Sequence, residues 1–255
     1  MNARPYILRE INWKTVKDTE YQVAVLPWGA TEAHNYHLPY GTDVIESEYI
    51  AAESARLAWE AGAKVIVLPT IPFGVNTGQL DIKLDINMNP STQAAVLQDV
   101  IVSLAHQNIG KLVILNGHGG NDFRQMVREL QPQHPDIFIS TMEWYRILDI
   151  KSYFDDPGDH GAEMETSIML HIAPELVLPL EEAGSGKAKK SRLRAIREGI
   201  AWAPREWPLV TEDTGIGNPA KATARKGAAY LKDMLVKIAD YYIELAACDI
   251  NDLYE

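Results

Sequence analysis

Four short apolar runs alternate along this chain with longer segments of helical spacing. The runs are bounded by turn residues and have the length of buried strands. Strands that alternate with helices in this way form a parallel sheet with helices on both faces. We therefore expect an α/β fold, a three-layer α/β/α sandwich around a mostly parallel central sheet. The predicted strands are Gln22 to Leu26, Lys64 to Leu68, Lys111 to Leu115 and Ile137 to Thr141.

The helices are predicted from apolar residues that recur three or four positions apart. Two stretches between them, Pro69 to Pro90 and Glu181 to Pro219, look irregular. Loops of this length are uncommon in a compact domain unless they serve a site. The predicted helices run from Val44 to Ala61, from Thr92 to Asn108 with Ser91 as N-cap, from Asp122 to Leu130, from about Ala162 to Ile172, and from Lys221 to Ala247.

Size and charge narrow the classes of partner. A chain of 255 residues that is 46% hydrophobic can bury one large core, so we expect a single domain over residues 1–255. Its 35 acidic and 24 basic residues give a formal net charge of -11. This charge disfavours binding to nucleic acid or an anionic membrane and favours a small-molecule substrate. A lone cysteine, Cys248, and an N-terminus without a signal-peptide pattern predict a cytoplasmic protein.

The first group of candidate metal ligands follows the first predicted strand. Glu32, His34 and Asp43 lie in one strand-to-helix connection, and open α/β sheets bind ligands at the carboxyl ends of their strands. Glu32 and His34 are two residues apart and point the same way in an extended stretch, while Asp43 stands where a helix N-cap would. The three can converge on a metal ion. The alternative is a polar loop with two hydrogen-bonded histidines and a capping aspartate.

The second group follows the third predicted strand and reads Asn116-Gly-His-Gly-Gly-Asn121. Glycines on both sides of His118 let the backbone turn sharply and approach a bound group closely. A nucleotide-binding turn of the form G-x-G-x-x-G would need glycine at position 122, where Asp122 stands. We therefore interpret His118 as a metal ligand.

The third group, Asp159 to Ser167, opens a predicted helix. Glu163 and Glu165 near its N-terminus could serve only to favour the helix dipole. His160 lies beside them in a turn that contains glycine. Imidazole, with a pKa of about 6.5, can accept and donate a proton near neutral pH. We predict that His160 is a catalytic acid and base.

The segment from Lys187 to Arg197 carries six basic residues. Such a run usually forms a solvated, mobile face. The alternatives are a surface that holds an acidic substrate or a neighbouring subunit, and a nucleic-acid-binding module, which the negative net charge contradicts.

In this order, the three groups resemble the motifs of the creatininase family of metal-dependent amidohydrolases. The second family motif, N-G-H-G-G-N, matches at all six positions, and the third, H-A-G-E-x-E-T-S, differs only in the order of Gly161 and Ala162. The first motif, approximately G-S-x-E-Q-H-G-x-H-L-P-x-x-T-D, keeps its spacing. In this chain it reads Gly29-Ala-Thr-Glu-Ala-His-Asn-Tyr-His-Leu-Pro-Tyr-Gly-Thr-Asp43. The resemblance runs from about Val25 to Leu170 and implies a creatininase-like fold.

The resemblance implies a site for two divalent metal ions, with Zn²⁺ expected first and Mn²⁺ or Fe²⁺ as alternatives. Glu32 and His118 would bind one ion, His34 would bind the other, and Asp43 would bridge them. Paired ions of this kind make water nucleophilic at neutral pH and polarise a carbonyl. His160 would then relay a proton to the departing nitrogen.

The second ion needs another carboxylate. Creatininase takes it from a glutamate two residues after the histidine of the second motif, where this chain has Gly120. Family members with glycine there use a glutamate of the third motif. We therefore expect Glu163 to be the replacement ligand and Glu165 to have an outer or structural part.

Departures from the family pattern leave the substrate open. Creatininase has a tryptophan four residues before its catalytic histidine, on a flap over the substrate, and Asp156 stands there in this chain. We expect Trp144 to compensate as a substrate contact, and His37 to contact substrate or lie just outside the ligands. The first expectation is a creatinine amidohydrolase-like enzyme for a small-molecule, possibly cyclic, amide. The alternatives are hydrolysis of a purine- or pyrimidine-derived formamide and a noncatalytic metal-binding protein. The family also includes enzymes that clip peptides. The resemblance also implies a homo-oligomer, often a hexamer.

Overall fold

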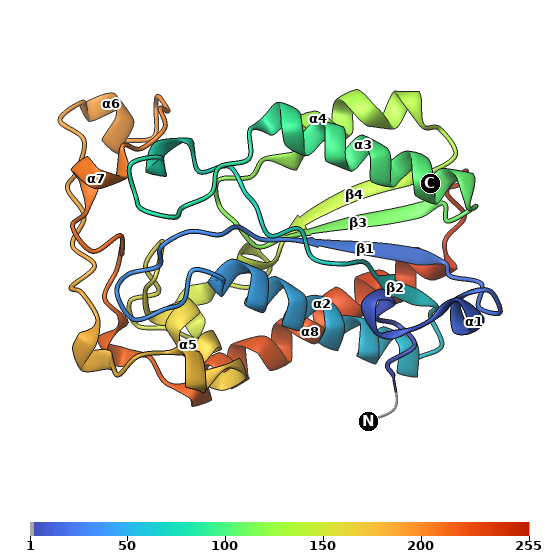
Figure 1. The fold of residues 1–255 in the computed structure, drawn as a ribbon, viewed down its shortest axis with the longest axis horizontal. Helices are drawn as coiled ribbons and strands as arrows, with labels where there is room; N and C mark the ends of the chain where they lie inside the picture. The colour runs from blue at the N-terminus through green and yellow to red at the C-terminus, as the bar shows by residue number, and fades with distance from the viewer. Residues whose placement is uncertain (1–2, 255) are drawn as a thin grey trace.

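The centre of the molecule is a parallel sheet of four strands in the order β2-β1-β3-β4 (Figure 1). The computed structural model describes residues 3–254. All three strand pairs are parallel, so the four carboxyl ends lie at the same edge of the sheet. The expected α/β fold around a parallel sheet is confirmed. The strands are β1 (Val23–Trp28), β2 (Val65–Val67), β3 (Lys111–Asn116) and β4 (Phe138–Glu143).

Helices cover both faces of this sheet (Figure 1). One face packs against α2 and α8, with α5 packed on α8, and the other face packs against α3 and α4. The five long predicted helices are all present. The helices are α1 (Trp13–Val16), α2 (Thr42–Glu60), α3 (Pro90–His106), α4 (Phe123–Leu130), α5 (Glu163–Ile172), α6 (Arg194–Arg197), α7 (Trp207–Val210) and α8 (Ala224–Ala247).

Alternate residues of each strand fill two separate cores. In β1, Val23 and Val25 belong to the core shared with α2 and α8, while Ala24 and Leu26 belong to the core shared with α3 and α4. This follows from the two-residue period of a strand, which sends successive side chains to opposite faces. Because both faces are covered, the strands are apolar throughout. The sheet is therefore a rigid base for the loops at its carboxyl edge.

Helices α3 and α2 each begin two residues earlier than predicted, and α8 begins three residues later. Helix α3 begins at Pro90 with Asn89 as N-cap, so Ser91 lies inside the helix. Proline favours the first helical position because its φ is already helical and its missing N–H would have no partner there. Helix α2 begins at Thr42 with Gly41 as N-cap. Asp43 therefore does not cap the helix, and its side chain is available to the loop after β1.

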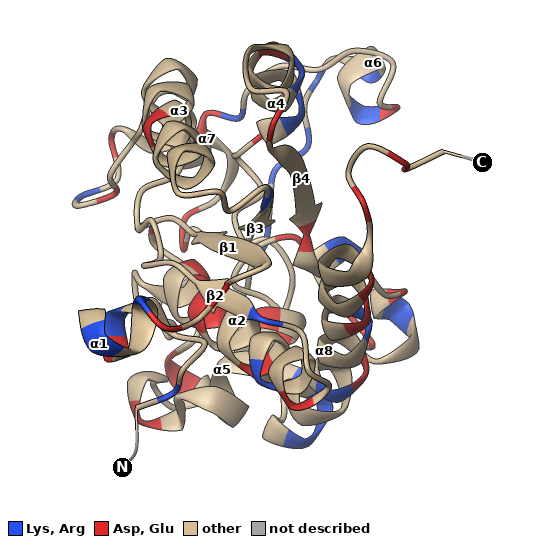
Figure 2. Cartoon of the chain, turned by 90° about the vertical axis from the view of Figure 1, so that its right-hand side faces the viewer, with Lys and Arg blue, Asp and Glu red and all other residues tan. Residues whose placement is uncertain are grey.

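The predicted irregular segment after α5 extends away from the sheet. It contains only the short helices α6 and α7 besides 3-10 turns, and it lies at the left-hand end of the molecule in Figure 1. In Figure 2 the ribbon of α6 is coloured blue where it carries Lys and Arg residues. We call residues 187–210 the arm. Across residues 3–254, no helix is both long enough and apolar enough to cross a membrane.

Candidate metal centre

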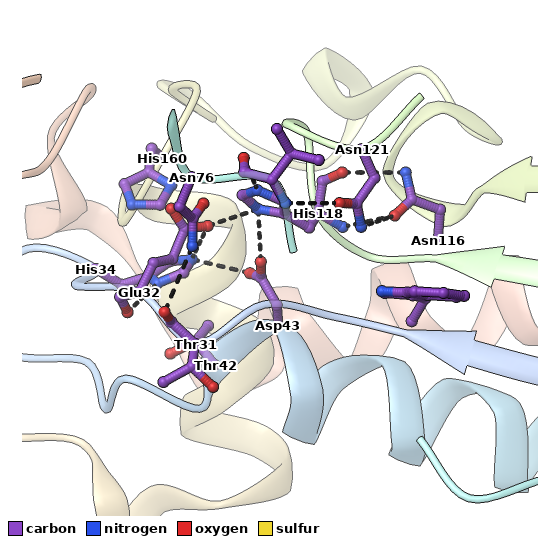
Figure 3. A network of polar contacts seen from close by, with 12 residues as sticks. Thr31, Glu32, His34, Thr42, Asp43, Asn76, Asn116, His118, Asn121 and His160 are labelled. Atoms are coloured by element: carbon purple, nitrogen blue, oxygen red, sulfur yellow. Dashed lines mark hydrogen bonds and ion pairs between the residues drawn. The ribbon is translucent and has the colours of Figure 1, made fainter. Parts of the chain in front are cut away.

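Four of the predicted ligands meet at the carboxyl ends of β1 and β3. Glu32 and His34 lie in the connection after β1, Asp43 lies in the first turn of α2, and His118 lies in the turn after β3. All four side chains are buried, and they point toward one another (Figure 3). We call these four residues the ligand cluster.

Asp43 stands between the two histidines of the ligand cluster. Its Oδ1 lies 2.9 Å from Nε2 of His34, and its Oδ2 lies 3.0 Å from Nδ1 of His118. Oε1 of Glu32 lies 2.6 Å from the same nitrogen of His118. One carboxylate that directs an oxygen toward each of two imidazoles has the arrangement expected of a ligand that bridges two ions.

Several polar atoms inside the ligand cluster have no hydrogen-bond partner among residues 3–254. They include Oε1 of Glu32, Nε2 of His34 and Oδ2 of Asp43, although each lies close to another polar atom of the cluster. Buried polar atoms are almost always hydrogen-bonded, so this convergence needs a physical explanation. Imidazole nitrogens and carboxylate oxygens are the ligands that Zn²⁺ and related divalent ions prefer. The residues present therefore fit a cation site.

Backbone carbonyl groups orient both histidines of the ligand cluster. Nδ1 of His34 lies 3.1 Å from the carbonyl oxygen of Glu32, and Nε2 of His118 lies 3.1 Å from that of Val75. A ring nitrogen that donates its proton to a carbonyl leaves the other nitrogen free, and metal-binding histidines usually have such a partner. In both residues the remaining nitrogen is the one that faces Asp43.

The electrostatics of the ligand cluster favour positive charge at its centre. Burial lowers the pKa of His34, but the Asp43 carboxylate reverses this effect and the pKa lies well above its ordinary value. Burial also lowers the pKa of His118, but the Glu32 carboxylate outweighs this effect and the pKa is again raised well above its ordinary value. Burial raises the pKa of Glu32, yet the imidazole of His118 holds it well below its usual range. A divalent cation would satisfy the same carboxylates without protonated imidazoles.

Glu165, and not Glu163, lies beside the ligand cluster. Oε1 of Glu165 is 3.8 Å from Nε2 of His34. The Glu163 carboxylate instead accepts a hydrogen bond of 2.6 Å from the backbone N–H of Asp156 and pairs with Lys226 of α8. Residues two apart on a helix are about 200° apart around its axis, so both cannot face the same site. The prediction that Glu163 lies with the other candidate ligands is thus wrong, and Glu165 is the glutamate of α5 at that position.

His160 approaches the ligand cluster from the turn before α5. Its ring centroid lies 4.0 Å from that of His34, with the ring planes inclined by 32°. Its Nε2 lies 2.8 Å from the carbonyl oxygen of Ala33, and its side chain is 7% exposed. Ligand atoms of His160, His34 and Glu32 lie within 4.8 Å of one another. The geometry places His160 where it can either bind an ion or exchange a proton with a bound group.

A comparison with models of known families identifies the family of this chain. The model of the creatininase family, described as creatinine amidohydrolase, matches residues 9–242. The chain belongs to the creatininase family. The predicted membership is confirmed over most of the chain.

Relatives in the creatininase family carry different names. A mycofactocin precursor peptide peptidase from Mycobacterium ulcerans is 28% identical over 219 residues, which cover 83% of this chain and 80% of that protein. The creatinine amidohydrolase of Pseudomonas putida is 27% identical over 210 residues, which cover 69% and 75%. Membership of the creatininase family therefore indicates an amide-cleaving hydrolase but does not single out one substrate.

Solved structures show the same creatininase-like fold. A Bacteroides fragilis protein, provisionally named a creatinine amidohydrolase, is 43% identical with a TM-score of 0.94, and the match covers 100% of both chains. A creatininase mutant of Zn-Zn type has a TM-score of 0.78 at 22% identity, covering 96% of this chain and 100% of that one. A manganese form of creatininase has a TM-score of 0.77 at 23% identity, covering 95% and 99%. The last two matches carry the fold alone.

Two residues predicted to contact substrate are buried in this creatininase family member. Trp144 is 1% exposed and packs edge-on against Tyr145 at the margin of the core shared with α2 and α8. His37 is also 1% exposed, and its Nε2 lies 2.8 Å from Oγ1 of Thr166. Neither side chain faces an open surface. The substrate contact predicted for Trp144 is therefore corrected. His37 was predicted either to contact substrate or to lie just outside the ligands, and the second of these stays a prediction. The sequence does not reveal whether a residue at the end of a strand turns outward or into the core.

The loop from Pro69 to Pro90 supplies two residues that the sequence did not single out. Nε2 of Gln79 donates a hydrogen bond to Oε2 of Glu32, and this orients the glutamate toward His118. A carboxylate oxygen of Asp85 accepts a 2.8 Å hydrogen bond from the backbone N–H of Ala33, and burial raises the pKa of Asp85 to about 6. The unusual length of this loop predicted a functional site, but no local spacing pointed to Gln79 or Asp85.

Proposed function

We propose that this protein is a two-metal amidohydrolase that cleaves a C–N bond of a small-molecule amide. The observation that carries the proposal is Asp43, whose two oxygens face one nitrogen each of His34 and His118 in a buried cluster. Membership of the creatininase family supports the reaction class, because relatives of this chain are named for amide hydrolysis.

The ligand cluster, together with Glu165 beside it, divides into two sets around Asp43. Glu32 and His118 would hold one ion, His34 and Glu165 would hold the other, and Asp43 would contact both. Bound divalent ions would supply a water nucleophile at neutral pH and polarise the scissile carbonyl. Mixed nitrogen and oxygen ligation suits Zn²⁺, with Mn²⁺ or Fe²⁺ as alternatives.

His160 would hold the proton that the departing nitrogen needs. Its Nε2 bond to the carbonyl of Ala33 fixes the ring, and its contact with the His34 ring keeps it beside the ligand cluster. Burial at this position excludes bulk water from the proton. Protonation of the nitrogen matters because an amine that leaves as an anion would re-form the amide.

Peptide cleavage is the second candidate function, because four mycobacterial relatives that each match more than four-fifths of this chain are named mycofactocin precursor peptide peptidases. A peptide and a small amide present the same carbonyl and nitrogen to the metal ions. The two candidates differ only in the groups that extend from the scissile bond, which the loops around the ligand cluster must accommodate.

Metal analysis joined to a substrate screen tests the proposal. Purified protein loaded with Zn²⁺ or Mn²⁺ is analysed for bound metal by mass spectrometry and incubated with creatinine, formamidopyrimidines and short peptides. We expect about two ions per chain and hydrolysis of at least one substrate class that disappears on chelation and returns with metal. Turnover that survives complete removal of metal would refute the mechanism. A protein that holds its metal but cleaves nothing in the panel would support the noncatalytic alternative instead.

A further inference from the structure

Trp207 of the arm lies against the ring of His160. The two ring centroids are 4.8 Å apart, and the planes meet at 61° in an edge-to-face arrangement. The same imidazole also lies against the ring of His34. His160 is therefore in contact with the ligand cluster through one aromatic neighbour and with the arm through another. No local pattern in the sequence indicates this contact, because helix α5 and a long irregular stretch separate His160 from Trp207.

Contacts on both sides of the arm fix the position of Trp207. The guanidinium of Arg205 pairs with Asp159, which is adjacent to His160, and lies 5.7 Å from the centre of the Trp207 ring. The carbonyl oxygen of Arg205 lies so close to Gly78 that a Cβ there would collide with it. The arm is therefore packed on the loop that carries Gln79 as well as on the loop that carries His160.

A second connection lies just beyond the arm. The backbone N–H of Ile216 donates a 2.7 Å hydrogen bond to the carbonyl oxygen of His160, and the backbone N–H of Asp159 donates one of 2.7 Å to the carbonyl oxygen of Ile216. These bonds hold the chain that follows the arm alongside His160. The segment that carries Trp207 is thus bonded to residues 159–160 on both sides of the tryptophan, through Arg205 before it and Ile216 after it.

We propose that Trp207 contacts the leaving-group side of the substrate and favours amides whose departing amine carries a flat or aromatic group. This inference rests on the proposed function, in which His160 hands a proton to the departing nitrogen. Whatever is bonded to that nitrogen must then lie next to His160. The partly buried indole of Trp207 is the large aromatic surface at that place, and indole faces and edges pack well against flat groups.

The opposing interpretation is that Trp207 only covers His160. A cover would influence all amides equally, because it acts through the position of His160. A substrate contact would distinguish amides by their leaving groups. The two interpretations therefore differ in a ratio between two ligands, which a general loss of stability or activity does not change.

Two ligands with the same acetyl group separate these interpretations. The leaving group of acetanilide is aniline, and that of acetamide is ammonia. Binding of each to the metal-loaded full-length protein is measured by ligand-detected NMR, which also records any hydrolysis. The variants are Trp207→Ala and Trp207→Phe, and the matched control is Trp202→Ala, which removes a tryptophan of the same arm that is 85% exposed. Metal content and sedimentation of every variant are compared with those of the wild type.

We expect Trp207→Ala to weaken acetanilide binding by about tenfold, the scale of one aromatic contact, and acetamide binding by less than about twofold. Trp207→Phe should recover most of the acetanilide affinity, and Trp202→Ala should match the wild type. The inference is overturned if the wild type does not bind acetanilide, if both ligands weaken equally in Trp207→Ala, or if Trp202→Ala behaves like Trp207→Ala. Binding that depends on Trp207 in a protein that hydrolyses nothing would leave the inference intact and refute only the proposed function.

Discussion

The ligand cluster and the arm differ in almost every physical respect. The side chains of the cluster are between 0% and 5% exposed and follow directly from β1, α2 and β3, whereas Ile200 and Trp202 of the arm are 75% and 85% exposed. A reacting centre needs fixed distances, which a parallel sheet with two buried faces provides. A substrate contact can vary without harm to the fold when it lies on an irregular, exposed segment.

His160 links these two regions, because it lies in contact with His34 of the ligand cluster and with Trp207 of the arm. Under the proposed function, a division of roles between these two regions would account for relatives of one family that are named for creatinine and for a peptide. The ligand cluster and the strands and helices that carry it, which we call the rigid region, would carry the reaction class. The exposed arm would carry the choice of substrate.

The largest effect should come from loss of the central carboxylate. Asp43→Ala removes the residue that faces both histidines, so we expect bound metal to be lost and hydrolysis to fall to background. Metal analysis and the substrate screen measure both quantities. Glu60→Ala, at the exposed end of the same helix α2, is the control and should keep both. A metal-depleted Asp43→Ala protein with normal turnover would break the comparison, because the rigid region would then not carry the chemistry.

Removal of the linking residue should have the next largest effect. His160→Ala should lower turnover by about 10²- to 10⁴-fold, the usual contribution of acid–base catalysis, with metal content unchanged. His171→Ala, an exposed histidine on α5, should have no effect on either quantity. Loss of one metal equivalent in His160→Ala would instead identify His160 as a ligand, since its nitrogen is close enough to those of the cluster to share an ion.

A comparison of two glutamates at the start of α5 sharpens the boundary of the rigid region. Glu165→Gln should weaken metal binding by at least about tenfold, because its carboxylate is next to His34. Glu163→Gln should leave metal binding unchanged and lower the free energy of unfolding by about 1–3 kcal/mol, because it disturbs the bond to Lys226. Metal titration and urea denaturation distinguish the two. The reverse pattern would restore Glu163 as the ligand.

The smallest expected effect is a pH dependence of stability from His37. Burial, with a further contribution from the charge of His34, lowers the pKa of His37 from 6.5 to about 4. Between pH 6.5 and about 4, His37 is therefore protonated in the unfolded chain but neutral in the folded protein. Its contribution to the free energy of unfolding falls as pH falls through this window. In chelator-treated protein, the stability difference between wild type and His37→Gln should change across this window. A constant difference from pH 7 to pH 4 would show that His37 stays accessible to protons, which would place it outside the rigid region.

Much of the architecture was predictable because local spacing determines it. Apolar runs gave the four strands to within two residues, and helical spacing gave α2, α3, α4, α5 and α8. The ligand types were predictable for a related reason: a parallel sheet brings the ends of its strands to one edge, so Glu32, His34, Asp43 and His118 had to lie near one another once the strands were known.

The orientation of side chains was decided by tertiary packing. Glu163 and Glu165 are indistinguishable in sequence, and the rotation of α5 against α8 directs the first to Lys226 and the second to His34. Trp144 resembled a substrate contact but is enclosed in the core. These outcomes depend on which face of an element meets its neighbours, and no local pattern records that.

What this sequence determined by itself is a parallel α/β sheet with residues of metal-binding type at its carboxyl edge, because strand and helix periods and side-chain chemistry are properties of neighbouring residues. Only the tertiary structure decided that Gln79 orients Glu32 and that Trp207 reaches His160. Both contacts join residues far apart in the chain through irregular loops, whose paths are set by the whole fold and not by any repeating pattern in the sequence.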